Sequence, residues 1–162
     1  MIKLNLGCGY DRKAEYVNVD QIKTPASDIL ADLHHLPFKK NAFNEVYLSH
    51  VLEHILEPDK ALKEVHRISK LNGKIIIRVP HAFTHSNFLN PTHRTHFLIG
   101  TILYWTCFRE FGEPLFKLEK TELKAGRRIW NILLNASKES CEHLVFPIWL
   151  LNPEIVYTLS KL

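Results

Sequence analysis

Short hydrophobic runs separated by polar stretches dominate the first half of the chain, a pattern typical of β-strands. Five runs predict strands over these ranges: Ile2–Leu6, Tyr16–Val19, Asp28–Leu30, Glu45–Leu48 and Lys74–Val79. The fifth run is almost wholly apolar, as expected of a strand that is covered on both faces. Strands that alternate with crossovers in this way predict a largely parallel sheet with layers on both sides.

The connections between these strands differ in kind. About ten residues separate the first two strands, which is near the lower limit for a crossover that carries a helix, so the first helix must be one or two turns long or absent. A longer helix is predicted from Pro58, a good first helical residue, to the left-handed stop supplied by Asn72-Gly73. Its apolar positions recur at helical spacing: Ala61, Leu62, Val65 and Ile68.

Beyond Pro80 the pattern changes. Residues 83–96 are polar and rich in histidine, which predicts a long loop over the sheet edge, and a short helix is expected near residues 101–108. Two further ranges alternate like strands and bring the total to seven: Leu115–Leu123 and Ile155–Leu159. Between them, residues 126–153 are predicted to form a helical insertion that packs on the domain, on a partner subunit or over a pocket.

Together these elements predict one α/β domain over residues 1–162. Its sheet is doubly wound, seven-stranded and mostly parallel, with a shortened first crossover and a helical insertion before the last strand. A chain of 162 residues with 46% hydrophobic content fits one domain with a sizeable core.

Composition limits the partners and the location. The net charge is +4, yet no run of five like charges occurs, so the pattern favours a solvated basic surface over a nucleic-acid groove. Three cysteines without CxxC spacing fit a reducing cytosol: Cys8, Cys107 and Cys141. A predicted strand starts at once, leaving no room for a signal peptide, and the longest apolar stretches are too short to span a bilayer. We therefore expect a soluble, cytoplasmic protein.

Glycines and polar residues stand where the predicted strands end, and parallel sheets bind ligands at the carboxyl ends of strands where the strand order reverses. In chain order, these residues are Gly7 and Gly9, Asp20, Asp32, Ser49-His50 and Pro80-His81. Glycines permit a tight turn and leave room for a bound molecule. Asp20 can accept hydrogen bonds from both ribose hydroxyls, and Asp32 can accept one from an adenine amine beside apolar Leu33 and Leu36. Their order along the chain indicates an adenosine-containing cofactor, although each residue alone is also explained by a turn or cap.

Five segments, in this order, resemble successive motifs of class I S-adenosylmethionine-dependent methyltransferases, most closely the type 11 group. They are Asn5-Leu6-Gly7-Cys8-Gly9, Val17-Asn18-Val19-Asp20, Ala31-Asp32-Leu33-His34-His35-Leu36-Pro37-Phe38, Leu48-Ser49-His50-Val51-Leu52-Glu53-His54 and Leu71-Asn72-Gly73-Lys74-Ile75-Ile76-Ile77. The resemblance covers roughly the first half of the chain. It implies the Rossmann-like methyltransferase fold, with S-adenosyl-L-methionine as cofactor and S-adenosyl-L-homocysteine as product.

By that resemblance, the cofactor-binding residues are Asn5, Leu6, Gly7, Cys8, Gly9, Asp20, Asp32, Leu33 and Ser49. The cofactor half is then about residues 1–80, and the acceptor-side loop and insertion are about residues 81–153. Two departures affect the first motif: Asn5 stands where the family usually has an acidic residue, and Asp11 replaces the third glycine. The missing glycine and short crossover also argue against a nicotinamide oxidoreductase, because a pyrophosphate needs a full helix N-terminus.

Ten histidines are a high density, and five are expected around one pocket mouth: His50, His81, His85, His93 and His96. One of them could act as the general base of methyl transfer, with His81 the first candidate and His93 the second. His93 and His96 could share a face as metal ligands if their segment were helical, but Pro91 favours a loop, so we expect no metal. For each histidine, hydrogen bonding to backbone in a polar loop is the alternative.

The leading hypothesis is methyl transfer to an oxygen or nitrogen atom of a small molecule or cell-envelope precursor, with a homodimer through residues 126–153 as a possible assembly. The alternative is a catalytically silent protein that binds the cofactor or its product for regulation or interaction, which the short first crossover and Asn5 make credible. A nucleic-acid methyltransferase is disfavoured, because the fourth strand ends in Leu48-Ser49-His50 rather than in the Asn/Asp-Pro-Pro-aromatic motif of enzymes that methylate base amino groups.

Overall fold

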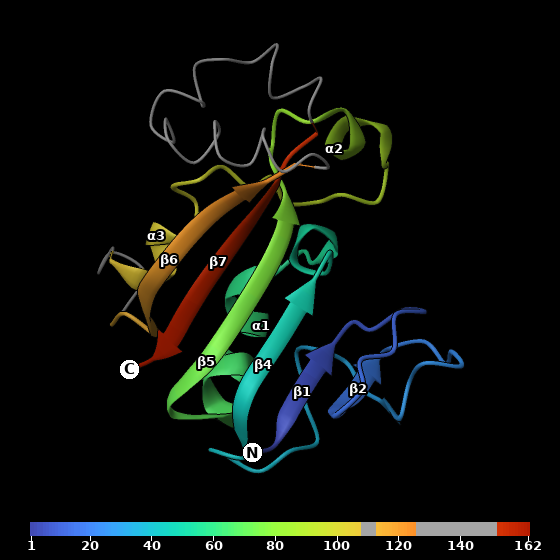
Figure 1. Ribbon diagram of the computed structural model, residues 1–162, viewed down its shortest axis with the longest axis vertical. Helices are drawn as coiled ribbons and strands as arrows, with labels where there is room; N and C mark the ends of the chain where they lie inside the picture. The colour runs from blue at the N-terminus through green and yellow to red at the C-terminus, as the bar shows by residue number, and fades with distance from the viewer. Residues whose placement is uncertain (108–112, 126–151) are drawn as a thin grey trace.

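The computed structural model describes residues 1–107, 113–125 and 152–162, and it contains a sheet with strand order β3-β2-β1-β4-β5-β7-β6 (Figure 1). The strands are β1 (Lys3–Leu6), β2 (Tyr16–Asp20), β3 (Ile29–Leu30), β4 (Phe43–Ser49), β5 (Ser69–Pro80), β6 (Phe116–Lys124) and β7 (Glu154–Lys161). Strands β1 to β5 pair in parallel, and β7 lies antiparallel between β5 and β6. The predicted seven-stranded, mostly parallel α/β fold is confirmed.

The strand order reverses between β1 and β4. Strand β1 pairs with β2 on one side and with β4 on the other, so that Leu4 lies opposite Val17 of β2 and Val46 of β4. This register aligns the carboxyl ends of β1, β2 and β4 at one edge. A crevice forms at such a point, because the connections that leave the two central strands diverge.

The connection between β1 and β2 contains turns and no helix, as its length requires. Side-chain hydrogen bonds hold it instead. The buried amide of Asn5 donates to the backbone oxygen of Asp11 (3.2 Å) and to Oδ1 of Asn18 (2.9 Å), which also accepts from the backbone nitrogen of Lys13 (2.9 Å). Asn18 is fully buried, and its backbone nitrogen donates to a carboxylate oxygen of Asp28 (2.9 Å). Two buried amides thus replace a crossover helix.

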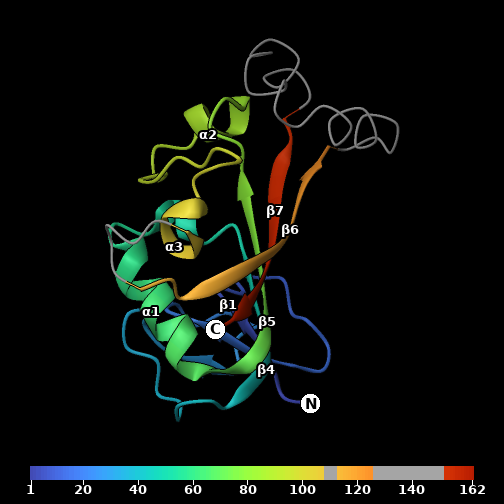
Figure 2. The same ribbon diagram turned by 90° about the vertical axis from the view of Figure 1, so that its left-hand side faces the viewer.

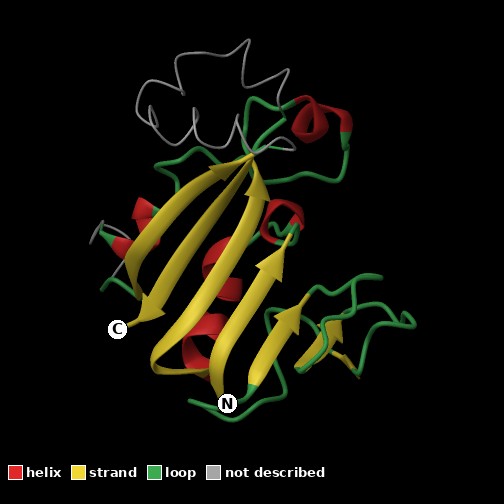
Figure 3. Cartoon of the chain, in the orientation of Figure 1, coloured by secondary structure: helices red, strands yellow, loops and turns green. Residues whose placement is uncertain are grey.

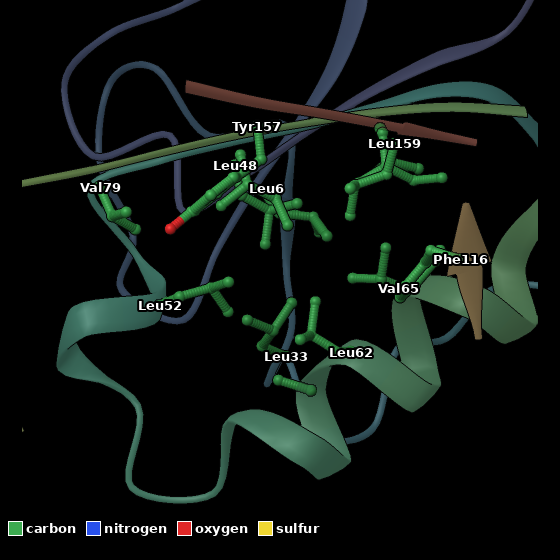
Figure 4. Packing of buried hydrophobic residues seen from close by; sticks show 14 of the residues in the cluster. Leu6, Leu33, Leu48, Leu52, Leu62, Val65, Val79, Phe116, Tyr157 and Leu159 are labelled. Carbon is green, nitrogen blue, oxygen red and sulfur yellow. The ribbon is translucent and has the colours of Figure 1, made fainter. Parts of the chain in front are cut away.

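Helix α1 (Pro58–Ile68) packs four buried residues, Ala61, Leu62, Val65 and Ile68, against the sheet. Figure 4 shows Leu62 and Val65 facing Leu33, Leu52 and the strand residues of the core. The predicted start of this helix at Pro58 is correct. Its end differs from the prediction, because Ser69 is already extended and begins β5, whereas Asn72 takes its positive φ of 56° within β5.

The segment after β5 contains more structure than the predicted loop. A short helix, α2 (His85–Leu89), follows Thr84, and α3 (Leu103–Thr106) lies within the range expected for a short helix. Strand β6 follows α3 along the chain. The polar loop between α2 and α3 packs against the 3-10 turn η1 (Leu52–His54), because the backbone nitrogens of Arg94 and Thr95 donate to the backbone oxygen of Glu53. The predicted helical insertion at 126–153 lies almost wholly outside the described residues.

Helices α1 and α3 lie on the same side of the sheet (Figures 2 and 3). In the part of the chain that the structure describes, the opposite face carries polar side chains that bond to one another: Tyr16 donates to Glu45, and Arg78 donates to the hydroxyl of Tyr47 (3.0 Å). Among these residues, no helix is both long and apolar enough to cross a bilayer.

Candidate active site

A cavity of about 460 Å³ opens at the carboxyl ends of β1, β2 and β4. It is lined by Leu6, Gly7, Gly9, Val19, Asp20, Gln21, Ala31, Asp32, Leu33, His34, Leu36, His50, Val51, His54, Ile55 and Leu56. We call it the first cavity. Its walls combine backbone, two carboxylates and aliphatic side chains, which suits a ligand with a polar sugar and an apolar ring.

The turn after β1 requires glycine at two positions for different reasons. Gly7 has φ of 64°, and a Cβ there would lie 2.3 Å from Cγ2 of Val51. Gly9 has φ of 51°, but a Cβ there would meet no atom within 4 Å. Both need the left-handed conformation, which costs other residues energy. Because Gly7 has no Cβ, the side chain of Val51 can pack against the turn. Gly9 leaves open space beside the first cavity.

Asp20 joins the end of β2 to this turn. Its Oδ2 accepts a 2.7 Å hydrogen bond from the backbone nitrogen of Gly9, and its Oδ1 accepts one of 3.0 Å from the nitrogen of Ile22. Thr24 supports the same turn, because its hydroxyl donates to the oxygen of Gly9 (2.5 Å). The carboxylate is therefore fixed in direction, and each oxygen keeps a lone pair for a ligand hydroxyl.

The third wall is the segment after β3. Asp32 accepts hydrogen bonds at Oδ1 from the backbone nitrogen (2.9 Å) and Nδ1 (2.8 Å) of His34, and the first of these lowers the pKa of the Asp32 carboxyl. The buried Leu36 is anchored from α1, because its backbone nitrogen donates to Glu64 (3.0 Å) and its oxygen accepts from Arg67 (2.9 Å). Helix α1 thus positions the apolar side of the first cavity.

A second cavity of about 300 Å³ lies beside the first, and His50 and His54 line both. Its lining consists of His50, Glu53, His54, Pro80, Ser86, Asn90, His93, Asn152, Pro153 and Glu154. Most of these residues are polar, and they come from the residue after β4, η1, the end of β5, the segment around α2 and the start of β7. It lies over the carboxyl ends of β4 and β5, the edge at which parallel sheets bind ligands.

His50 links the two cavities and has a strained backbone with φ of 55°. Its Nδ1 donates to Glu53 (3.2 Å) and its Nε2 donates to Glu154 (2.9 Å). The bond to Glu154 contributes most, and together with the bond to Glu53 it raises the pKa of His50 to about 9. The same bond between His50 and Glu154 is the main cause that lowers the pKa of Glu154 to about 2. Arg78 donates to the other oxygen of Glu154. His50 is therefore an imidazolium at neutral pH.

The structure brings six of the nine residues expected to bind the cofactor to the wall of the first cavity: Leu6, Gly7, Gly9, Asp20, Asp32 and Leu33. The other three do not line it. Asn5 is buried with its amide on the β1–β2 connection, Cys8 is buried behind the turn with its pKa raised by burial, and Ser49 is the last residue of β4.

The two histidines expected as general bases lie in different places. His81 is fully buried and lines neither cavity. Its backbone pairs with Phe97, and its backbone nitrogen donates to the backbone oxygen of Pro153 (3.1 Å). His93 lines the second cavity. Sequence reasoning missed the acidic partners in this cavity. Glu53 had a usable signal, since it adjoins the predicted strand end, but Glu154 lies 104 residues from His50 and had none.

Comparisons with known proteins agree with this geometry. Residues 4–77 match the sequence model of a methyltransferase domain family, type 11. An uncharacterised protein of Methanocaldococcus jannaschii is 36% identical over 89 residues, which are 47% of this chain and 39% of that protein. A demethylmenaquinone methyltransferase of Renibacterium salmoninarum is 36% identical over 73 residues, 44% of this chain and 30% of that one. The chain thus matches less than half the length of these curated relatives.

Among solved structures, a SAM-dependent methyltransferase from Archaeoglobus fulgidus superposes with a TM-score of 0.66 at 14% identity, covering 98% of this chain and 85% of that one. The fold is therefore that of the class I S-adenosylmethionine-dependent methyltransferases. Within that fold, residues 4–77 resemble the type 11 methyltransferase domain.

Proposed function

We propose that the first cavity binds S-adenosylmethionine, with the ribose on Asp20, the adenine against Asp32 and Leu33, and the methionine end toward His50. The hydrogen bond from Gly9 to Asp20 carries this proposal, because it aims a carboxylate across the turn where a ribose would lie. Asn5, Cys8 and Ser49 then act behind the cofactor, by shaping the turn and the end of β4.

In this proposal the acceptor occupies the second cavity. Its nucleophilic atom attacks the methyl carbon, the carbon–sulfur bond breaks with its electron pair going to sulfur, and S-adenosylhomocysteine results. The proton of the acceptor passes to His93, the candidate general base that lines this cavity. Because the sulfonium is already a good leaving group, alignment and proton removal are the main tasks of the protein.

For the acceptor, we propose an oxygen or nitrogen atom of a small molecule or cell-envelope precursor. The cavity of about 300 Å³ supports a small acceptor group, and its polar lining supports one that carries hydrogen-bonding atoms. The demethylmenaquinone methyltransferase relative favours a second candidate, a quinone precursor. We further propose that residues 1–162 act as one domain in the cytoplasm, that residues 81–153 serve the acceptor side, and that residues 126–153 form any homodimer contact.

The test is transfer of a labelled methyl group from S-adenosylmethionine to a panel of phenols, amines, envelope precursors and quinone precursors. Transfer to one class, absent in Asp20→Ala, would establish the activity. Glu113→Ala is the matched control, since Glu113 is an exposed carboxylate that lines neither cavity. Binding of the cofactor without transfer to any acceptor would favour the silent regulatory protein instead.

A further inference from the structure

Three ligand-type side chains converge on the second cavity: the carboxylate of Glu53 and the imidazoles of His54 and His93. One donor atom from each lies within 4.8 Å of the others. Donors bound tetrahedrally to one ion at about 2.1 Å lie about 3.4 Å apart, so a shift of less than about 1 Å by each side chain would close the set. The two segments are already fixed together, because the backbone nitrogens of Arg94 (2.6 Å) and Thr95 (3.0 Å) donate to the oxygen of Glu53.

Glu53 is the unusual member of this cluster. Its side chain is fully buried (0% exposed), and Oε1 accepts from His50, but Oε2 has no hydrogen-bond partner in the described structure. A buried carboxylate oxygen without a partner is costly, and such groups normally pair with a cation or bind a metal. The carboxylate also lines the second cavity, so a cation there would be within reach.

The hydrogen bonds of His93 leave its Nε2 available as a ligand. Asn87 is buried, and its amide group donates to the oxygen of Ala82 (2.9 Å) and to Nδ1 of His96 (2.8 Å). The amide oxygen of Asn87 can only accept, so the 3.0 Å contact assigns the proton to Nδ1 of His93. Its Nε2 therefore keeps its lone pair.

The same reasoning applies to His54. The hydroxyl of Thr92 donates its only proton to Asn90 (2.7 Å), so it accepts from Nδ1 of His54 (2.9 Å), as does the Thr92 backbone oxygen (3.3 Å). Both histidines thus donate through Nδ1 to a fixed acceptor. This arrangement orients metal-binding imidazoles in proteins and sets the tautomer that presents Nε2 to the metal.

We propose that Glu53, His54 and His93 bind one divalent transition-metal ion of the zinc type at the wall of the second cavity. Two imidazoles and one carboxylate favour such an ion over Mg²⁺ or Ca²⁺, which take oxygen ligands. Three protein ligands leave a coordination position for water or an acceptor oxygen. The sequence pointed to His93 and His96, but His96 bonds to Asn87 and is not part of the cluster.

The role of the ion rests on the proposed methyl transfer. An acceptor oxygen bound to it would lose its proton more readily, because a divalent ion lowers the pKa of a bound hydroxyl. His93 would then be a ligand, and water could take the proton. Metal binding itself does not depend on the methyl transfer and can be measured without cofactor or acceptor.

The test is titration of the metal-stripped full chain with Co²⁺, a spectroscopic substitute for Zn²⁺, followed by its visible absorption. We expect one ion per chain, with at least about ten-fold weaker binding in Glu53→Gln and in His93→Gln. His35→Gln is the control, because His35 is exposed and lines neither cavity, and it should bind as the parent chain does. No Co²⁺ binding by the parent, or unchanged binding in both variants, would overturn the proposal.

Glu53 is buried, so folding must be checked by a separate readout. His93 is only half-buried in a loop, and His93→Gln should melt as the parent does, which keeps the test valid if Glu53→Gln does not fold. Binding of S-adenosylhomocysteine is measured on the same samples. Co²⁺ binding without S-adenosylhomocysteine binding would support the metal site while contradicting the proposed function. S-adenosylhomocysteine binding without Co²⁺ binding would support the proposed cofactor site while contradicting the metal site.

Discussion

The backbone nitrogen of Gly9 donates a 2.7 Å hydrogen bond to Oδ2 of Asp20, which joins the turn after β1 to the end of β2. Asp20→Ala removes both this bond and the carboxylate proposed to hold the ribose. Because hydrogen bonds to a charged group contribute about 1.5–3 kcal/mol each, we expect binding of S-adenosylhomocysteine to weaken about ten- to one-hundred-fold. Isothermal calorimetry measures this.

Asp20→Asn separates the two roles, since an amide oxygen can still accept from Gly9. Its NH2 group loses the bond from Ile22, so it should keep more of the parent's stability than Asp20→Ala does and still lose much of the affinity. Affinity equal to that of the parent in both variants would place the ribose elsewhere.

Gly7 and Gly9 should respond differently to alanine. Gly7→Ala combines a left-handed backbone with a Cβ 2.3 Å from Val51, so we expect a loss of unfolding free energy of about 2 kcal/mol or more. Gly9→Ala has only the backbone cost of about 1–2 kcal/mol, but its methyl group would point into open space beside the first cavity and weaken cofactor binding. Urea unfolding measures the stability of both variants.

A double variant, Gly7→Ala with Val51→Ala, provides the control for the contact. It should regain part of the stability lost in Gly7→Ala, relative to Val51→Ala alone. Simple addition of the two single effects would show that Val51 does not limit the turn.

Asn18 should be a main determinant of stability, although it touches no ligand. Its side chain is buried and bonds to Asn5, Lys13, Tyr16 and Asp28. Asn18→Leu leaves several of these partners unsatisfied, so we expect a loss of about 3 kcal/mol or more in unfolding free energy. Chemical denaturation measures it, and a change of less than about 1 kcal/mol would contradict the role given to this network.

Glu64 should make stability depend on pH. Arg67 holds the pKa of Glu64 below its ordinary value of about 4.3. A carboxyl with a depressed folded pKa stabilises the protein above its unfolded pKa, and this contribution is lost as pH falls through the folded value. The stability difference between the parent and Glu64→Gln should therefore be full near neutral pH and shrink in acid below about pH 4.3. A difference that is independent of pH would show that the ion pair contributes nothing.

Much of the first cavity could be predicted because its residues follow strand ends that the sequence shows directly. Gly7, Gly9, Asp20 and Asp32 each come straight after a hydrophobic run, and parallel pairing brings those ends together. The same reasoning placed His81 in the site. The structure buries it, because β5 continues to Pro80 and the next residue pairs with Phe97 rather than turning into a cavity.

The second cavity was less accessible to sequence reasoning because its charges come from distant segments. Glu154 meets His50 only because β7 inserts antiparallel beside β5 and starts at the ligand-binding edge. Likewise, the amides of Asn5 and Asn18 replaced a helix that the sequence could only show to be short or absent. Such pairings depend on strand order, which local periodicity does not encode.

The central claim is that the first cavity binds S-adenosylmethionine. The most direct measurement is calorimetric titration of the purified chain with S-adenosylmethionine and S-adenosylhomocysteine, with NAD as the control. The structure predicts binding of the first two with micromolar dissociation constants, one molecule per chain, and no binding of NAD. Absence of binding by either methionine-derived ligand would contradict the claim and reduce the glycine turn and Asp20 to a structural role.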